Sequence, residues 1–311
     1  MRRCSSGSTP VFLFLLTLSA AAAQTPAPHP AAAAAASSDP GRVSIPVSVT
    51  DLSDRLVATT LPPKSFTLLD DHHPQPLVSV SRGDVPSSIA ILLDLSASMK
   101  DRLDWERAAV REFLKYANPQ DEYLLIGFAD RPALIGGFTS PPKEIEARLA
   151  GLETGRGTAL YDAILFSLDE LQHARYSRRS LFIVTDGAEN SSSHSVDEVQ
   201  QAVRRAGLRI DCADIFVPPA STRQERDAPD YLHTLSKETG GRTFPILSSS
   251  GVQPVAARIG VELRTEYILA FQPAPADRDG RWHKLKVRVS RPPGVPSLVV
   301  YAPEGYFAPT R

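Results

Sequence analysis

Short apolar runs recur along the middle of the chain and alternate with amphipathic segments. Residues 88–94 and 180–185 consist mainly of apolar residues, which is typical of strands buried on both faces of a parallel sheet. Apolar positions at near-helical spacing predict helices over residues 102–116 and 196–206. This alternation predicts an α/β fold with a doubly wound, mainly parallel sheet of the Rossmann-like type.

The same patterns predict the remaining elements of this region. Further strands are predicted over residues 123–128, 210–217 and 243–246, with an edge region at residues 138–139. Further helices are predicted over residues 160–171, 231–239 and 252–263.

Both ends of the chain carry a different pattern, with a period of two. Strands are predicted there over residues 43–50, 66–69, 77–80, 266–271, 282–289, 298–301 and 305–307. We therefore expect a β-rich accessory module built from the two flanks, with the α/β domain inserted between them.

The N-terminal segment indicates export. Arg2 and Arg3 precede an apolar stretch, residues 11–23, that ends in three alanines, as in a secretory signal peptide. The stretch is short for a membrane span, and we expect a periplasmic or secreted protein without a membrane span after cleavage. An uncleaved N-terminal anchor is the alternative.

These patterns divide the chain into five parts. We predict a signal peptide at residues 1–23, an Ala/Pro-rich linker at 24–41, an N-terminal β-module at 42–86, the α/β domain at 87–263, and a C-terminal β segment at 264–311 that packs with the N-terminal module.

Composition narrows the partners and the chemistry. The formal net charge is −1 and the charges are mixed along the chain, so no basic stripe indicates nucleic acid as a partner. Removal of the signal peptide leaves Cys212 alone, without an internal disulfide, and we expect a buried, inert thiol. His72 and His73 are expected to be solvated turn residues, and Trp282 and Tyr306 to be core residues.

Oxygen-bearing side chains follow two of the predicted buried strands and one loop. Asp94, Ser96 and Ser98 end the first strand, Thr158 lies in a glycine-rich loop, and Asp186 ends the second strand. Loops at the carboxyl ends of parallel strands converge at one edge of the sheet. Because carboxylate and hydroxyl oxygens suit hard cations, these residues predict a site for Mg²⁺, Ca²⁺ or Mn²⁺.

The order of these motifs resembles the von Willebrand factor A (VWFA) domain and its metal-ion-dependent adhesion site (MIDAS). The resemblance implies that Ser96, Ser98 and Thr158 contact the metal, and that Asp94 and Asp186 bind it directly or through water. One departure is Ala97, since the family usually has glycine between the two serines. The flanks also resemble secreted bacterial VWFA-related proteins, through Val-Thr-Asp, Tyr-x-Leu and Gly-Tyr-Phe segments.

The resemblance implies an exported, non-enzymatic protein that binds a protein partner. A Glu or Asp of the partner would complete the coordination shell of the metal, as in other A domains. Mg²⁺ is the expected ion, with Ca²⁺ or Mn²⁺ as alternatives.

Two other functions stay open. In a metal-assisted hydrolase, Asp94, Asp186 or Glu189 would serve as the general base. In a structural envelope component, the metal site would be degenerate or would only stabilise loops. Asp162 is expected to cap a helix or to pair with a lysine or arginine, and Asp130 to be a turn residue.

Overall fold

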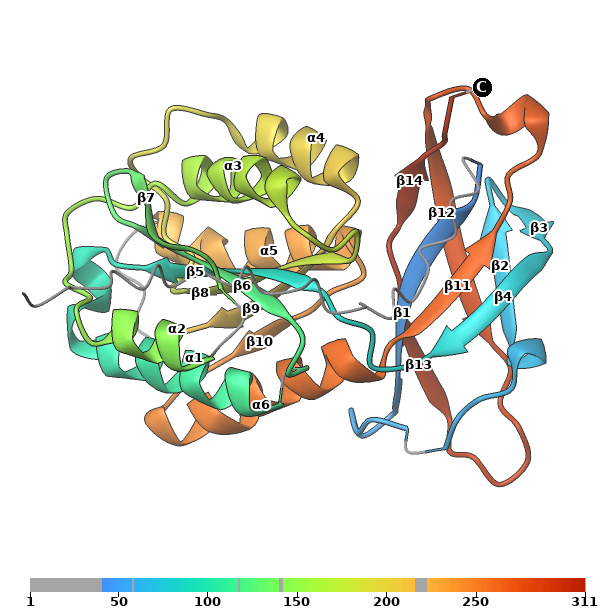
Figure 1. The fold of residues 1–311 in the computed structure, drawn as a ribbon, viewed down its shortest axis with the longest axis horizontal. Helices are drawn as coiled ribbons and strands as arrows, with labels where there is room; N and C mark the ends of the chain where they lie inside the picture. The colour runs from blue at the N-terminus through green and yellow to red at the C-terminus, as the bar shows by residue number, and fades with distance from the viewer. Residues whose placement is uncertain (1–40, 58, 117, 140–141, 216–222, 311) are drawn as a thin grey trace, which may run out of the picture. The chain divides into compact units, whose positions relative to one another are not determined.

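The computed structural model describes residues 41–57, 59–116, 118–139, 142–215 and 223–310, which form three β-sheets with helices on the largest (Figure 1). The predicted signal peptide, and the predicted linker apart from Gly41, lie outside the described residues. No helix within the described ranges combines the length and apolar character that crossing a membrane requires.

The largest sheet has six strands and contains both strands predicted from the apolar runs. The strand order is β10-β9-β8-β5-β6-β7. The strands are β5 (Ser88–Asp94), β6 (Glu122–Phe128), β7 (Pro132–Thr139), β8 (Arg179–Thr185), β9 (Arg209–Asp214) and β10 (Thr243–Pro245). Its strands pair in parallel except for the edge strand β7, which is antiparallel to β6. The predicted mainly parallel, doubly wound sheet is confirmed.

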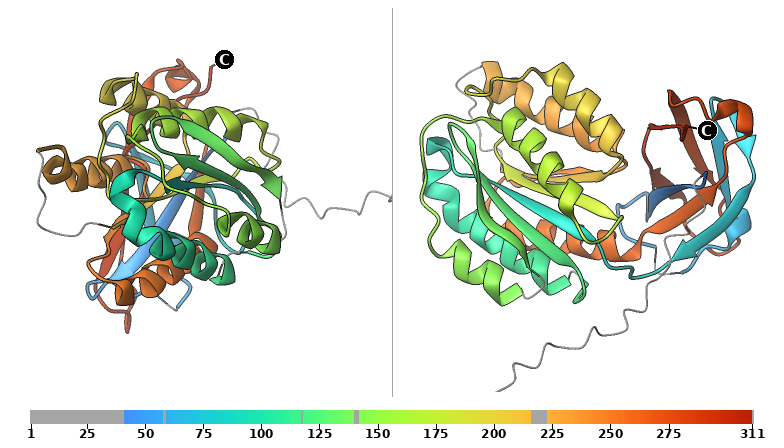
Figure 2. Two further views of the ribbon diagram at one scale, coloured as in Figure 1. Left: turned by 90° about the vertical axis from the view of Figure 1, so that its left-hand side faces the viewer. Right: turned by 45° about the horizontal axis from the view of Figure 1, so that its top comes forward.

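Helices cover both faces of this sheet (Figure 2). They are α1 (Leu103–Tyr116), α2 (Pro142–Leu149), α3 (Leu160–Glu170), α4 (Val196–Ala206), α5 (Arg223–Glu238) and α6 (Ser249–Thr265). One core contains buried residues of α1, α2 and α6, and the other contains buried residues of α3, α4 and α5. Each amphipathic helix therefore buries its apolar side against one face of the sheet.

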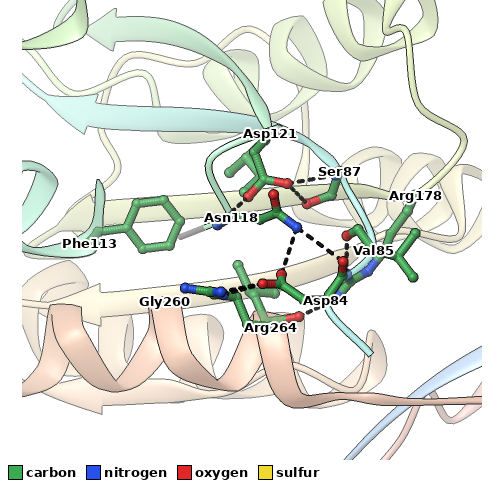
Figure 3. Close-up of a pocket in the computed structure, with 11 residues that line it drawn as sticks. Asp84, Val85, Ser87, Phe113, Asn118, Asp121, Arg178, Gly260 and Arg264 are labelled. Atoms are coloured by element: carbon green, nitrogen blue, oxygen red, sulfur yellow. Dashed lines mark hydrogen bonds and ion pairs between the residues drawn. The ribbon is translucent and has the colours of Figure 1, made fainter. Parts of the chain in front are cut away.

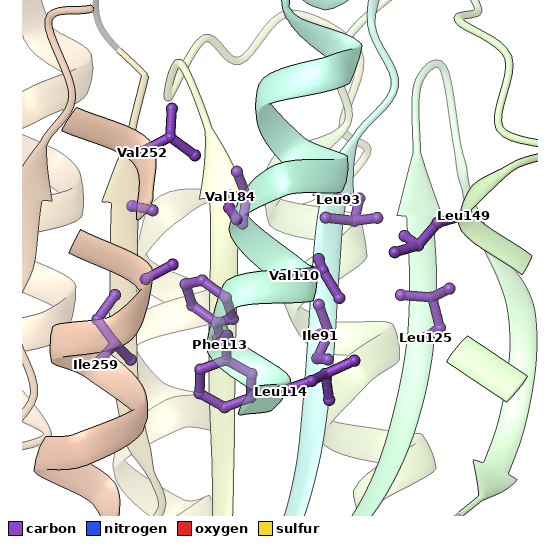
Figure 4. Packing of buried hydrophobic residues seen from close by; sticks show 14 of the residues in the cluster. Ile91, Leu93, Val110, Phe113, Leu114, Leu125, Leu149, Val184, Val252 and Ile259 are labelled. Carbon is purple, nitrogen blue, oxygen red and sulfur yellow. The ribbon is translucent and has the colours of Figure 1, made fainter. Parts of the chain in front are cut away.

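Strand β5 supplies side chains to both cores in strict alternation. Ile91 and Leu93 enter the core under α1 and α6 (Figure 4). Leu92 enters the opposite core, and all three side chains are fully buried. Phe113 of α1 packs on Phe182 of β8 with ring centroids 4.8 Å apart. Because successive strand residues point to opposite faces, a continuous apolar run is what a strand covered on both sides requires.

The two flanks of the chain form two further sheets of four strands each, with the orders β13-β1-β11-β4 and β14-β12-β2-β3. Their strands are β1 (Val43–Asp51), β2 (Phe66–Asp70), β3 (His73–Gln75), β4 (Leu77–Arg82), β11 (Tyr267–Phe271), β12 (Trp282–Val289), β13 (Leu298–Tyr301) and β14 (Gly305–Phe307). Each sheet mixes strands from both ends, and a shared apolar core includes Tyr306. The predicted β-rich module from both flanks is confirmed, while its exact boundaries stay predictions.

The segment that joins β4 to β5 is held at the amino ends of the six-stranded sheet (Figure 3). Asp84 accepts hydrogen bonds from Asn118 Nδ2 at 2.7 Å and from Arg264 Nε at 2.7 Å. The Ser87 backbone N–H donates to Asp121 Oδ1 at 2.7 Å. Arg264 lies near the end of α6, so the entry to the six-stranded sheet and the exit from its last helix are tied to each other.

Several elements differ from the sequence-based expectation. Strand β3 was not predicted, and β7 begins at Pro132, well before the edge region expected at residues 138–139. Helix α2 was not predicted, because it begins with the second of two consecutive prolines and four of its eight residues are charged. Helix α5 begins at Arg223 rather than at residue 231, and it contains Pro229. A proline normally marks a helix boundary because it lacks the N–H and clashes with the preceding turn, and here the helix continues through it.

The single cysteine of the described chain is as inert as expected. Cys212 in β9 is fully buried and unpaired, and Ser236 Oγ donates a hydrogen bond to its Sγ at 3.3 Å. Burial raises the pKa of this thiol to about 12. The thiolate, which is the reactive form, is therefore scarce at neutral pH.

Candidate metal centre

Asp94, Ser96 and Ser98 form one hydrogen-bonded chain at the carboxyl end of β5. Asp94 Oδ1 accepts the Ser96 N–H at 3.0 Å, and its Oδ2 accepts the Thr185 hydroxyl at 2.6 Å. Ser96 Oγ and Ser98 Oγ lie within hydrogen-bond distance of each other, at 2.9 Å. Asp94 and Ser96 are buried and Ser98 is exposed, so the hydroxyls lie between a buried carboxylate and solvent.

Thr158 lies in a loop that is hydrogen-bonded to both neighbouring loops. Its N–H donates to Asn190 Oδ1 at 2.9 Å, and its carbonyl oxygen accepts the Asn190 N–H at 3.0 Å. In the same loop, the Gly155 N–H donates to the carbonyl oxygen of Leu95 at 2.6 Å. The loop that contains Thr158 (the threonine loop) is thus attached by backbone hydrogen bonds to the loop that contains Ser96 and Ser98 (the serine loop). It is attached in the same way to the loop that follows Asp186.

Asp186 directly follows β8, next to β5 in the sheet. Its Oδ1 accepts the Ala188 N–H at 3.1 Å, and its Oδ2 lies 4.0 Å from Nη1 of Arg102. Burial, followed by the negative charge of Asp186, raises the pKa of Asp94 to about 7. The three predicted motifs therefore meet at one edge of the sheet, while the assignment of their side chains as metal ligands stays a prediction.

Two buried carboxylates near this edge were missed. Glu106 of α1 is fully buried, and its Oε1 accepts the Asp94 N–H at 2.9 Å. Burial, together with the charge of Asp94, holds the pKa of Glu106 well above its usual range. Asp214 ends β9, the neighbour of β8, and is 2% exposed. Neither Glu106 Oε2 nor Asp214 Oδ1 has a hydrogen-bond partner in the described part of the chain.

A sequence signal existed for Glu106 but not for Asp214. The strand β9 that Asp214 ends also contains the charged Arg209 and Asp211, and the sequence predicted a strand over residues 210–217, so Asp214 did not mark the end of an apolar run. Glu106 falls on the apolar side of its helix, three and seven residues before the buried Ala109 and Phe113. A charged residue at such a position requires a partner inside the protein.

The charge at this edge fits a bound cation. Four carboxyl groups are buried here, those of Asp94, Glu106, Asp186 and Asp214. Within the described part of the chain, their one ion pair is the 4.0 Å contact between Asp186 and Arg102. Buried carboxylates of like charge destabilise one another unless they take up protons or a cation. The available donors are carboxylate and hydroxyl oxygens, which are the ligands that Mg²⁺ and Ca²⁺ prefer.

Gly157 permits the close approach of the threonine loop to its neighbour. Its φ is +72°, and a Cβ at this position would lie 2.5 Å from Ser191 Oγ and 3.2 Å from Asp130 Cα. We expect Gly157→Ala to lower the free energy of unfolding by about 1–3 kcal/mol, because a left-handed conformation and a clash both oppose the methyl group. Thermal unfolding measures this effect. Gly83→Ala is the control, since a Cβ at Gly83 would meet no atom within 4 Å and its φ is not positive, and equal losses in both variants would contradict the assignment.

Glu189 and Asp162 organise the loop that follows Asp186. Glu189 accepts hydrogen bonds from the backbone of Tyr161, Ser191 and Ser192, and from the Ser192 hydroxyl. Both of its oxygens are therefore engaged. Asp162 pairs with His194 Nδ1 at 2.8 Å and accepts the backbone N–H of His194. Its partner is therefore a histidine, where a helix cap or a lysine or arginine partner was expected.

Comparisons with known proteins point to one domain family. Residues 89–189 match the model of the von Willebrand factor type A domain. An uncharacterized protein of Borreliella burgdorferi is 27% identical over 134 residues, which cover 40% of this chain and 39% of that protein. Inter-alpha-trypsin inhibitor heavy chain H4 of Bos taurus is 25% identical over 139 residues, which cover 40% of this chain and 15% of that protein. The match thus spans less than half the length of either relative.

A solved structure is similar in fold. The structure described as von Willebrand factor type A from Catenulispora acidiphila has 9% sequence identity and a TM-score of 0.51, over 74% of this chain and 74% of that one. At this identity the likeness concerns the fold alone.

Proposed function

Because this chain carries a von Willebrand factor type A domain, we propose that it is an exported, non-enzymatic protein that binds a protein partner through a divalent metal ion. The proposed ligands are Asp94, Ser96, Ser98, Thr158 and Asp186, and an acidic side chain of the partner completes the shell. Domains of this family are generally interaction modules rather than enzymes, which supports the coarse part of the proposal.

The observation that carries the proposal is the group of four buried carboxyl groups, of Asp94, Glu106, Asp186 and Asp214, behind the exposed serine loop. A divalent ion on the hydroxyls of Ser96 and Ser98 would offset the charges of Asp94 and Asp186. A metal held mainly by neutral hydroxyls keeps an affinity for a further carboxylate. Binding of the partner then depends on the metal and is abolished by a chelator.

Ala97 is compatible with this loop. It opens the short 3-10 helix η2 (Ala97–Arg102), and it is not among the described residues with positive φ. Its side chain is exposed. The conformational freedom of glycine is therefore not required at this position, and we expect the departure from the family pattern to leave the metal site functional.

Calorimetric titration of the chelator-treated protein with Mg²⁺, Ca²⁺ and Mn²⁺ tests the metal site. We expect one ion to bind, and Ser96→Ala to weaken its binding at least tenfold by removing a proposed ligand. Ser81→Ala, at an exposed serine of β4, is the matched control and should bind as the wild type does. Absence of binding by the folded wild-type protein would overturn the proposal.

The partner is tested by capture with and without a chelator. Loss of the captured protein on chelation, and in Ser96→Ala, supports recognition through the metal. Capture that survives chelation supports the alternative of a structural envelope component. Glu189 is a poor general base for the hydrolase alternative, because both of its oxygens accept hydrogen bonds, from four donors of its own loop and of α3.

A further inference from the structure

A second group of metal-ligating side chains lies in the flanking sheet β14-β12-β2-β3. His283 of β12 faces the turn that follows β2, with its Nδ1 3.2 Å from Asp70 Oδ1 and 3.0 Å from Asp71 Oδ2. One ligand atom from each of the three residues lies within 4.8 Å of the others. Asp70 and His283 are buried, whereas the Asp71 side chain is 51% exposed, so solvent reaches the group from one side.

Neighbouring groups orient each of these side chains. Asp70 Oδ2 accepts the Tyr306 hydroxyl at 2.8 Å, and Asp71 Oδ1 accepts the Lys284 N–H at 2.9 Å. Each carboxylate therefore has one oxygen engaged by a protein donor and the other directed at His283 Nδ1. On the far side of the ring, Nε2 lies 3.3 Å from Asp279 Oδ1. A histidine with a carboxylate on its outer nitrogen is a common arrangement around protein-bound zinc.

The carboxylates of Asp70, Asp71 and Asp279 around the His283 ring favour a bound cation. With the Nε2 proton directed at Asp279, the Nδ1 lone pair would face two carboxylate oxygens. This arrangement is repulsive unless a second proton or a metal ion lies between the three atoms. Arg281 lies 3.8 Å from Asp279, on the outer side of the ring.

We propose that His283, Asp70 and Asp71 form a second metal site, separate from the one at β5, that binds Zn²⁺ or a similar transition-metal ion. A nitrogen ligand favours such an ion over Mg²⁺. Ligands at roughly 2.0–2.2 Å from a tetrahedral Zn²⁺ lie about 3.3 Å apart, close to the two separations of 3.0 and 3.2 Å at Nδ1. The exposed side at Asp71 leaves the fourth position to water.

Such a site would link segments far apart in the chain. It joins the β2–β3 turn to β12, 213 residues later. The described chain contains no disulfide that could make a comparable connection, since Cys212 is unpaired and buried. The metal would therefore stabilise the β-module, which is built from the N-terminal and C-terminal flanks of the chain.

Cobalt and zinc titrations of the full chelator-treated protein, with Mg²⁺ present at saturation, test this proposal. One equivalent of Co²⁺ should give the visible absorption of a tetrahedral complex, and Zn²⁺ should displace it. His283→Gln should abolish the absorption and weaken Zn²⁺ binding at least 100-fold, and Tyr306→Phe should weaken it about tenfold by freeing the Asp70 carboxylate. His233→Gln, at an exposed histidine of α5, is the matched control.

Further variants keep the result decisive. If His283→Gln fails to fold, Asp71→Asn provides the test. It alters a half-exposed ligand and should weaken Zn²⁺ binding at least tenfold. Ser96→Ala should leave Co²⁺ and Zn²⁺ binding unchanged, which separates this site from the proposed magnesium site. Absence of the absorption in the wild type, or equal absorption in His283→Gln, would overturn the proposal and leave His283 as an imidazolium among three carboxylates.

Discussion

Arg209→Met is expected to lower the free energy of unfolding by about 3–5 kcal/mol, because it leaves the buried Asp211 carboxylate without a counter-charge. Glu262 keeps its ion pairs with Arg242 and Arg258, and Glu266 keeps its ion pair with Arg178. Arg209 in β9 is 3% exposed. It donates to both oxygens of Asp211 at 2.6 and 2.8 Å, to Glu262 at 3.0 Å and to Glu266 at 2.8 Å. It also donates to the Ser48 hydroxyl at 2.5 Å.

This arginine connects the six-stranded sheet with the flanking strand β1 and with α6. Methionine has a similar length and keeps the packing of the stem, so the loss isolates the charge and its hydrogen bonds. Urea unfolding followed by tryptophan fluorescence measures the effect, since Trp105 lies in α1 and Trp282 in β12.

The control for Arg209→Met is an exposed ion pair. Lys115 lies 2.7 Å from Glu112 but its side chain is 64% exposed. Lys115→Ala should therefore change the stability far less than Arg209→Met does. A similar small change in Arg209→Met would show that the buried network adds little to stability.

Asp214→Asn is expected to stabilise the metal-free protein at pH 8 by up to about 4 kcal/mol. Burial, followed by the charge of Asp186, raises the pKa of Asp214 from 3.8 to about 7. Between these two values the folded protein keeps a proton that the unfolded chain has lost. The stability therefore falls as pH rises from about 4 to about 7, and it changes no further above that.

Asparagine removes this pH dependence because it carries no charge in either state. Urea unfolding with a chelator, at pH 4.5 and at pH 8, compares the two proteins. The wild type should lose stability between the two pH values by a larger amount than Asp214→Asn does. Asp230→Asn, at an exposed position of α5, is the matched control. Equal stability of Asp214→Asn and the wild type at pH 8 would contradict the assigned cost of this carboxylate.

Most of the fold follows from local patterns in the sequence. The alternation over residues 282–289 predicts β12 with its observed bounds, and the pattern over residues 196–206 does the same for α4. Ser195 and Glu198 form a capping box that specifies where α4 begins. Local signals of this kind fail for α2, whose eight residues begin with the second of two consecutive prolines.

Part of the candidate magnesium site could be predicted from the sequence, and part of it is visible only in the tertiary structure. Asp94 and Asp186 could be selected from the sequence, because each follows an apolar strand and parallel strands end at the same edge. The hydrogen bond from the Asp94 N–H to Glu106 could not, because it depends on how α1 packs over β5.

By itself the sequence determined most of the segments that become strands and helices, since periodicity and capping act over a few residues. Only the tertiary structure decided which distant polar groups share a buried environment. His283 meets Asp70 because β12 pairs with β2, with Leu285 opposite Asp70. Their charges interact strongly only because folding removes them from water. The sequence pattern of one segment does not predict which residue of a distant segment will lie next to it.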